Sequence, residues 1–191
     1  MEEHLFMKTR QLWIEKGYEH FGLYGPEMLS IKKIAKELSI ARTSFNYHFK
    51  SKDEFIDDLL SHHRELHSQF IEAGKMHCKK YVPDLHQLLL AFPDGLRFHK
   101  QLFNHSHISK YDEVFKKCNE ISAREFIIHL FTDYYNLPLK YEDAAQLHKS
   151  LEYTWYSRLD INNLSLEKLV ASTEEIMRAL LVLMDNMDKR A

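Results

Sequence analysis

The sequence predicts an all-α protein. Only five glycines and four prolines interrupt its 191 residues, and long stretches rich in Leu, Lys, Glu, Ile and His run between them. A β-sheet needs a turn about every 8–12 residues, whereas helices accommodate such long uninterrupted segments. At about 150 residues per domain, the length leaves room for a small module joined to a larger one.

The first predicted helix covers residues 4–24. Its apolar and aromatic side chains recur at helical spacing, and the pair Gly25-Pro26 ends the pattern. Ser30 then provides an N-cap for a second, short helix. The apolar face of this second helix consists of Ile31, Ile34, Ala35 and Leu38.

The helical pattern of apolar residues is interrupted at residues 39–41, and a third short helix is predicted from Arg42 to Tyr47. Phe45 and Phe49 are expected to point inward, while the polar residues between them stay outside. Together the second and third helices, joined by a short turn, form a helix-turn-helix arrangement held by the first helix.

A long fourth helix is predicted to begin at Ser51. Ser51 and Glu54 have the spacing of a capping box, in which the serine hydroxyl and the glutamate satisfy backbone amides at a helix start. The apolar pattern extends from there toward Gly74, a length of about 30 Å or more at 1.5 Å per residue.

Prolines divide the rest of the chain into helices near 84–104, 109–136 and 141–160. The last helix opens at Ser165 and repeats apolar residues at alternating spacings of three and four from Leu166 to Met187. The apolar stripe is broad enough for one side to face the core while another faces a second subunit. We therefore expect a homodimer through the last two helices, near 141–160 and 165–188.

The charge is distributed unevenly. Residues 1–52 carry nine Lys or Arg against six Glu, whereas the remainder carries seventeen against twenty-two acidic residues. A basic head on an acidic body suggests a local surface for a polyanion, although a solvated face of mixed charge is the alternative.

The first residues do not resemble a signal peptide, and no later run reaches the roughly 18 apolar residues of a membrane span. We therefore expect a cytoplasmic protein that does not enter a membrane. Cys78 and Cys118 form neither a Cys-x-x-Cys pair nor a disulfide framework, so both are expected to be reduced thiols.

The stretch YGPEMLSIKKIAKELSIARTSFNYHFKSKDEF, residues 24–55, resembles the N-terminal DNA-binding region of the TetR family of bacterial transcriptional repressors. The residues that match the family pattern in order and spacing are Gly25, Ser30, Ile31, Ile34, Ala35, Ile40, His48, Phe49, Ser51 and Lys52. The resemblance implies a helix-turn-helix domain over residues 1–52 and a helical effector-binding and dimerisation domain over residues 53–191.

Three residues depart from the family pattern. Ser39 replaces the turn glycine, so the turn is either built differently or carries the strain of a left-handed non-glycine residue, roughly 1–2 kcal/mol. Ala41 replaces the serine that usually caps the third helix. Asn46 stands where the family has a phosphate-contacting tyrosine, and Tyr47 is a substitute candidate one position later.

Side-chain chemistry assigns roles on DNA. Arg42 can donate two hydrogen bonds to guanine, Thr43 and Ser44 can contact either base of a pair, and Asn46 can pair with adenine. Phosphates are expected at Lys52, His48, Tyr47 and the amides of the second helix near Ser30. For each of these residues, an exposed side chain without a partner is the structural alternative.

No enzyme motif is present. The sequence contains no His-Glu-x-x-His, Glu-x-x-His, nucleophile elbow, phosphate-binding loop or dinucleotide fingerprint. The thirteen histidines include His63 and His67, one helical turn apart, but these are expected to be ordinary helix residues rather than a metal site. The sequence therefore predicts neither catalysis nor a cofactor or metal.

The resemblance implies an effector cavity in the body of the protein. The aromatic candidates for its lining are Phe70, Phe98, Phe103, Phe126, Tyr134 and Trp155, although most body aromatics must be core. Such a cavity suits an apolar or aromatic small molecule, with Arg97, His99 or Lys100 available to a carboxylate. The expected function is a ligand-responsive, homodimeric repressor of a palindromic operator on double-stranded DNA. The alternative is a helical protein-interaction or structural module without DNA binding.

Overall fold

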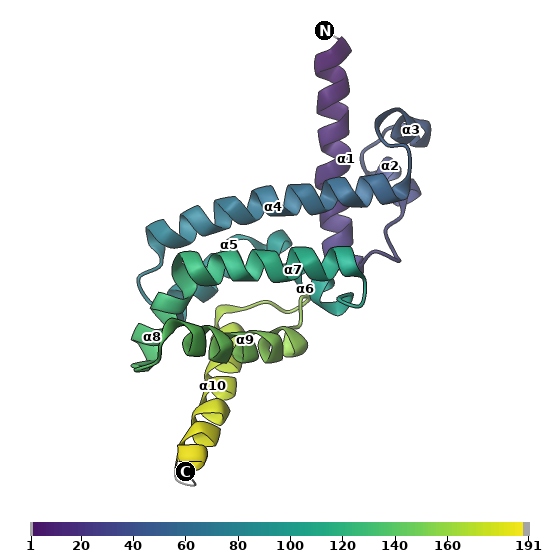
Figure 1. The fold of residues 1–191 in the computed structure, drawn as a ribbon. Coiled ribbons are helices and arrows are strands. Elements are labelled where there is room, and N and C mark those ends of the chain that lie inside the picture. The colour runs from purple at the N-terminus through teal and green to yellow at the C-terminus, as the bar shows by residue number, and fades with distance from the viewer. Residues whose placement is uncertain (1, 189–191) are drawn as a thin grey trace. The chain divides into compact units, whose positions relative to one another are not determined.

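The computed structural model describes residues 2–188, with side chains from Met7 to Leu183. Its longer helices are α1 (Glu2–Tyr24), α2 (Ile31–Glu37), α4 (Lys52–His77), α6 (Pro93–Asn104), α7 (Ser109–Ser122), α9 (Tyr141–Arg158) and α10 (Leu166–Asp188) (Figure 1). The shorter ones are η1 (Arg42–Ser44), α3 (Phe45–His48), η2 (Tyr81–Leu85), α5 (His86–Ala91), η3 (Ala123–Ile127) and α8 (Ile128–Tyr135). Every described element is helical, which confirms the predicted all-α class. Within the described part of the chain, none of the helices combines the length and apolar character that a membrane crossing requires.

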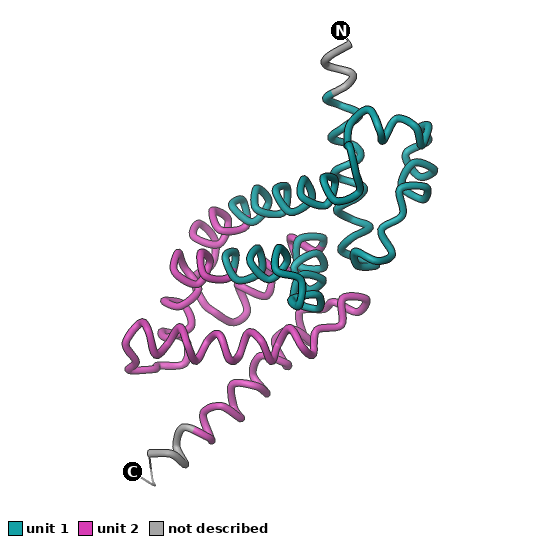
Figure 2. Tube along the Cα trace, turned by 45° about the vertical axis from the view of Figure 1, so that its right-hand side comes forward, with its two compact units in different colours: residues 1–69, 94–118 teal, residues 70–93, 119–191 magenta. Residues whose placement is uncertain are grey.

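The chain forms two compact units, shown in different colours in Figure 2. Unit 1 comprises residues 1–69 and 94–118, and unit 2 comprises residues 70–93 and 119–191. Helix α4 contributes its first turns to unit 1 and its last turns to unit 2. The predicted boundary between a DNA-binding domain (residues 1–52) and an effector-binding domain (residues 53–191) is a different division of the chain, and it stays a prediction.

An aromatic cluster forms the core of the N-terminal part of unit 1. Trp13 of α1 is fully buried and meets Phe45 of α3 edge-on, with ring centroids 5.3 Å apart. Phe55 of α4 lies 4.7 Å from Phe49 and 6.4 Å from Trp13, centroid to centroid. These contacts fix the short α3 segment between the two long helices α1 and α4, as its inward phenylalanines predicted.

The sequence allowed two forms of the turn between α2 and α3, and the structure has the one with a left-handed, strained Ser39. Ser39 has φ of 56°, in the left-handed region, which costs a non-glycine residue roughly 1–2 kcal/mol. Ser30 caps α2 as predicted, since its hydroxyl accepts a hydrogen bond from the amide of Lys33 at 3.4 Å. Ala41 provides no side-chain cap, and the predicted helix 42–47 opens as the 3₁₀ turn η1 before α3 begins at Phe45.

Helix α4 begins at the predicted capping residue. The amide of Glu54 donates to the Ser51 hydroxyl at 3.0 Å, while the Glu54 carboxylate accepts from the amide of Lys50 at 2.7 Å. The helix continues past Gly74 to His77. Gly74 therefore lies inside the helix. A Cβ at this position would come within 2.4 Å of the Phe126 ring, so the missing side chain allows close packing in unit 2.

A chain of buried polar groups crosses the other half of unit 1. The Tyr18 hydroxyl lies 2.7 Å from Nδ1 of His63, and Nε2 of His63 lies 2.9 Å from Nδ1 of His99. Phe98, fully buried, stacks on Tyr18 at 4.3 Å and on His63 at 4.8 Å, centroid to centroid. Burial is the main cause that lowers the pKa of His63, so this imidazole is neutral in the network.

Unit 2 is organised around the buried ring of Tyr81. Its hydroxyl lies 3.1 Å from Nε2 of His148 on α9, and its ring contacts Phe131 of α8 at 5.3 Å. Helix α10 joins this core through Thr173, whose hydroxyl lies 2.8 Å from Nε2 of His86. Burial lowers the pKa of both His86 and His148 to about 4, so neutral imidazoles are the form that packs here.

Two predicted helices differ in detail from those observed. The predicted helix 84–104 is divided at Phe92, whose backbone leaves the helical region at φ −119° and ψ 57° before Pro93 starts α6. A residue before proline is pushed out of the helical conformation by the pyrrolidine ring, which explains the break. The predicted helix 109–136 contains the π-helical turn η3 and ends at Asn136, which is left-handed with φ of 49°.

Gly17 is expected to be a sensitive position of α1. An alanine Cβ would lie 2.2 Å from Cζ of Phe55, which is fully buried against Trp13 and Phe49. The gain in helix propensity, about 1 kcal/mol, opposes an overpacking cost of typically 1–3 kcal/mol. Because the core here is tight on every side, we expect Gly17→Ala to lower the free energy of unfolding, measured by urea denaturation. Gln11→Ala on the exposed face of the same helix should change it by less than about 0.5 kcal/mol, and an unchanged or raised stability of Gly17→Ala would show that Phe55 can move aside.

Candidate nucleic-acid interface

The segment Arg42–His48 presents a polar outer face. Arg42, Thr43 and Asn46 are exposed, and Tyr47 is 79% exposed, an unusual position for a large aromatic side chain. The opposite face carries the buried Phe45. An exposed face of hydrogen-bond donors and acceptors on a firmly packed inner face is the arrangement that a helix needs to read the edges of bases in a DNA groove.

Two other residues of this segment are less accessible. The hydroxyl oxygen of Ser44 is buried and has no hydrogen-bond partner among the described residues. His48 is half-buried, and burial together with the nearby Arg10 lowers the pKa of its imidazole. The neutral form of His48 is therefore favoured near neutral pH, which reduces its attraction for a phosphate.

The two predicted phosphate contacts that flank the segment lie at the starts of α2 and α4. Ser30 caps α2 by accepting a hydrogen bond at its hydroxyl oxygen, so its O–H remains a donor for an anion. The ammonium group of Lys52 donates a hydrogen bond to the carbonyl oxygen of Pro26 at 3.0 Å. An ammonium has three donors, so this bond positions Lys52 and still leaves it able to reach a phosphate.

The charge around this face is mostly positive at its surface. The exposed cations of the region include Lys32, Lys33, Lys36, Arg42, Lys50 and Lys52. Two of the acidic groups are paired: the Glu37 carboxylate lies 2.9 Å from Nε2 of His20, and that of Glu27 lies 3.0 Å from Nε2 of His105. Both carboxylates accept hydrogen bonds from these histidines, and the exposed lysines and Arg42 give this face its positive character.

Contacts that hold the start of α4 could not be predicted from the sequence. The ammonium of Lys110, on α7, reaches the carboxylates of Asp53 and Asp57. Arg10 of α1 forms an ion pair with Asp58 and lies over the ring of Phe49, 5.3 Å from its centroid. These pairs join residues 48 to 57 positions apart in sequence, so no local pattern indicates them.

The predicted effector-lining residues fall into both units. In unit 1, Phe98 is fully buried, whereas Phe103 is half-buried and packs 5.6 Å from Phe115, centroid to centroid. Lys100, which the sequence offered to a carboxylate, is buried with its ammonium 5.0 Å from the Phe103 ring centroid, and burial lowers its pKa. The packing of Phe98 is that of a core residue.

The other four candidates belong to unit 2. Phe70 and Phe126 contact each other at 6.0 Å, centroid to centroid. Trp155 is buried and its indole donates to the carbonyl of Leu169 at 3.4 Å. Tyr134 is 41% exposed and its hydroxyl donates to Glu174. Phe70 and Phe126 form a ring pair, and a lining role for the six aromatics stays a prediction.

The described residues indicate neither a metal centre nor a disulfide. Among the described residues, no three His, Cys, Asp or Glu side chains gather closely enough to hold a metal ion. His63, one of the two histidines considered for a metal site, uses both ring nitrogens in hydrogen bonds with Tyr18 and His99. Cys78 and Cys118 are buried free thiols, as expected, and burial raises their pKa values to about 11 and about 12.

The sequence prediction missed a pocket of about 400 Å³ in unit 1. It is lined by His20, Tyr24, Lys33, Lys36 and Glu37, from α1 and α2. The sequence contained a signal for this pocket, because His20 and Tyr24 lie one turn apart on α1, and Lys33 and Lys36 lie one turn apart on α2. What the sequence alone does not provide is the register that brings these two helix faces together.

A comparison with family models gives a match over residues 7–59, to the family described as "Bacterial regulatory proteins, tetR family". The match covers α1 to the first turns of α4, and so contains the whole candidate interface. No curated protein is significantly similar in sequence to the chain.

Solved structures of the same fold cover nearly the whole chain. A transcriptional regulator of the "TerR/AcrR family" from Aquifex aeolicus VF5 aligns with a TM-score of 0.60 at 19% identity, over 92% of this chain and 99% of its own. A TetR/AcrR regulator from Thermobifida fusca YX-ER1 gives 0.57 at 18%, over 91% and 97%. The ketosteroid transcriptional regulator KstR2 of Mycobacterium tuberculosis gives 0.51 at 12%, over 93% and 94%. These likenesses show that the fold extends beyond the matched N-terminal region.

Proposed function

We propose that this chain is a transcriptional regulator of the TetR family, whose members bind DNA and are not enzymes, because its residues 7–59 match that family's model. We further propose that it acts as a homodimeric repressor of a palindromic operator. In this proposal Arg42, Thr43 and Asn46 contact bases, while Tyr47, Lys52 and the start of α2 at Ser30 contact phosphates. Ser44 and His48 are less accessible and make smaller contributions to DNA binding. A bacterial regulator that binds DNA would act in the cytoplasm, which is the proposed location.

The observation that carries the proposal is the two-sided build of the segment Arg42–His48. Arg42, Thr43, Asn46 and Tyr47 are exposed, and the inward Phe45 is packed against Trp13 and Phe55. An interaction module without DNA binding would not need exposed donors and acceptors on a segment anchored in this way. A cationic, hydrogen-bonding face on a rigid helix suits a DNA groove.

The exposed side of α10 supports dimerisation. Val182 and Leu183 are 54% and 61% exposed, although both are apolar. Leu169, Ile176 and Met177 of the same helix are buried. The earlier turns of α10 therefore pack in the core of unit 2, whereas Val182 and Leu183 near its end are exposed apolar side chains and are the candidates for contact with a second subunit. Met184 and Met187, the last members of the stripe, lie outside the described side chains.

The effector part of the proposal rests on the aromatic body. An apolar or aromatic small molecule that binds the DNA-incompetent arrangement more tightly would release the operator. A hundredfold preference corresponds to roughly 2.7 kcal/mol, and equal affinity for both arrangements would shift nothing. Such an effector and the operator should weaken each other's binding by the same factor.

Operator binding is the test. With a palindromic fragment from the region upstream of its own gene, Arg42→Ala should cost about 1–3 kcal/mol at one or two base positions and little at the others. Lys52→Gln should weaken all sequences alike and reduce the salt slope by about one. The measurement is fluorescence anisotropy with a series of single-base operator variants at several salt concentrations.

Lys117→Gln, an exposed cation on α7 outside the interface, is the matched control and should leave both affinity and salt slope unchanged. Equal losses on every sequence for Arg42→Ala and Lys52→Gln would show that Arg42 reads no base. Absence of any salt-sensitive binding would instead favour the interaction module.

A further inference from the structure

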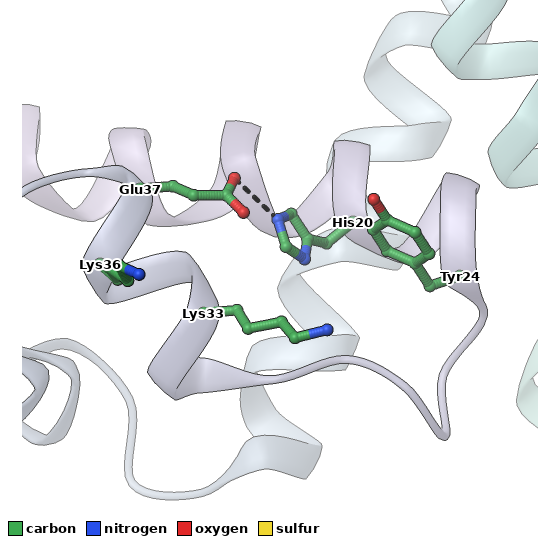
Figure 3. A pocket seen from close by; sticks show the side chains of 5 residues that line it. All are labelled: His20, Tyr24, Lys33, Lys36 and Glu37. Atoms are coloured by element: carbon green, nitrogen blue, oxygen red, sulfur yellow. Dashed lines mark hydrogen bonds and ion pairs between the residues drawn. The ribbon is translucent and has the colours of Figure 1, made fainter.

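We propose that the pocket between α1 and α2 is a binding site for a phosphate monoester. The side chains that line it are His20, Tyr24, Lys33, Lys36 and Glu37, drawn in Figure 3. This site is separate from the outer face of the segment Arg42–His48. The proposal does not depend on operator binding.

The central group is His20, which is only 3% exposed yet lines the pocket. Its Nε2 lies 2.9 Å from the Glu37 carboxylate, and the hydrogen bond from His20 is the largest cause that lowers the pKa of Glu37. A carboxylate accepts, so Nε2 carries a proton, and in the tautomer with this single proton Nδ1 is an acceptor. That Nδ1 is buried and has no hydrogen-bond partner among the described residues. A buried acceptor without a donor is costly, and a ligand that donates to it would relieve the cost.

The other polar groups of the pocket select an anion. Lys33 and Lys36 are exposed at its rim, and the Lys33 ammonium lies 5.9 Å from the centroid of the Tyr24 ring. The Glu37 carboxylate accepts a hydrogen bond from His20 and lies 3.5 Å from the Lys16 ammonium, which also pairs with Glu19 at 2.6 Å. Lys33 and Lys36 are the cations of the lining that can attract an anion, and Figure 3 shows the Lys33 chain extending toward the His20 ring.

These requirements together describe a ligand that is anionic and also donates a hydrogen bond. A phosphate monoester has a second pKa of about 6, so part of its population near neutral pH keeps a P–OH group. That hydroxyl can donate to Nδ1 of His20 while the charged oxygens accept from Lys33 and Lys36. Sulfate and the phosphodiester of a DNA backbone have no such proton. The volume of about 400 Å³ exceeds that of a phosphate group, and the half-exposed Tyr24 ring offers a surface for the organic part of the ester.

The test compares three anions on the full-length protein: inorganic phosphate, sulfate and dimethyl phosphate, titrated by calorimetry at constant ionic strength. Inorganic phosphate should bind about tenfold or more tightly than either of the others, since they lack the donor to His20. The double variant Lys33→Gln/Lys36→Gln should lose about tenfold or more in phosphate affinity. Lys32→Gln, an exposed lysine of α2 outside the pocket lining, is the matched control and should stay within about twofold.

A second measurement addresses His20 itself without removing a buried side chain. In the wild-type protein, phosphate should move the ¹⁵N resonance of its Nδ1, and sulfate should not. No phosphate binding at 10 mM, about equal affinities for the three anions, or equal losses in Lys32→Gln and the double variant would each overturn the proposal. If dimethyl phosphate binds as well as inorganic phosphate, and Lys33→Gln weakens operator binding where Lys32→Gln does not, the pocket takes a DNA phosphate and the monoester assignment is wrong.

Discussion

The double variant Val182→Glu/Leu183→Glu is expected to be a folded monomer that binds the operator about a hundredfold or more weakly than the wild type. Both side chains are apolar and more than half exposed on α10. In a dimer interface a glutamate would lose its hydration without a partner, a cost of several kcal/mol per buried charge. Two linked recognition segments bind a palindrome with an effective concentration that one segment lacks, which is worth about 10² to 10⁴ in affinity.

Sedimentation velocity at micromolar concentration measures the oligomeric state, and circular dichroism checks that the helices remain. Met76→Glu, at an apolar side chain of α4 that is 66% exposed in the same unit, adds a negative charge outside the last two helices and should remain dimeric. A wild-type protein that sediments as a monomer, or a charged variant that stays dimeric, would remove α10 from the proposed interface.

The largest loss of stability is expected for Phe98→Ala, about 3–5 kcal/mol in the free energy of unfolding. Phe98 is fully buried, and its ring stacks between Tyr18, Phe21 and His63 with centroid separations of 4.3 to 4.8 Å. Removing the ring leaves a cavity beside the hydrogen-bonded chain from Tyr18 to His99, and that polar chain cannot collapse to fill it.

Phe103→Ala, one turn later on α6 and only half-buried, is the comparison and should cost less than half as much. Both values come from urea denaturation followed by circular dichroism. This pair separates core from effector lining, because a residue that serves chiefly to contact an effector can be truncated at small cost to the unliganded protein. A loss below about 1 kcal/mol for Phe98→Ala would return Phe98 to the list of effector contacts.

Local sequence signals predicted the N-terminal region well. The Ser30 cap, the Ser51 hydroxyl cap and the Gly25-Pro26 stop each depend on a few neighbouring residues, and the structure confirms all three. The break at Phe92 was also within reach, because Pro93 is printed in the sequence and its effect on the preceding residue is steric. The π-helical turn η3 was not, since nothing in its composition differs from an ordinary helix.

The candidate interface was predictable only in part. Helical periodicity identified which side of the segment Arg42–His48 faces inward, and so Arg42, Thr43, Asn46 and Tyr47 are exposed as expected. The burial of the Ser44 hydroxyl depends on neighbours from other elements, which a single helix pattern does not contain. The same holds for the His20 pocket, where the decisive fact is the register of α1 against α2.

Ser39 has a consequence for how this protein tolerates mutation. Its left-handed backbone stores roughly 1–2 kcal/mol that a glycine would release, less the roughly 0.5–1 kcal/mol that a glycine costs through the unfolded chain. Ser39→Gly should therefore act as a second-site suppressor of destabilising changes elsewhere in the same unit, Gly17→Ala among them. This one substitution would raise the stability of the protein, and it lies in a turn rather than on the face that would contact DNA bases.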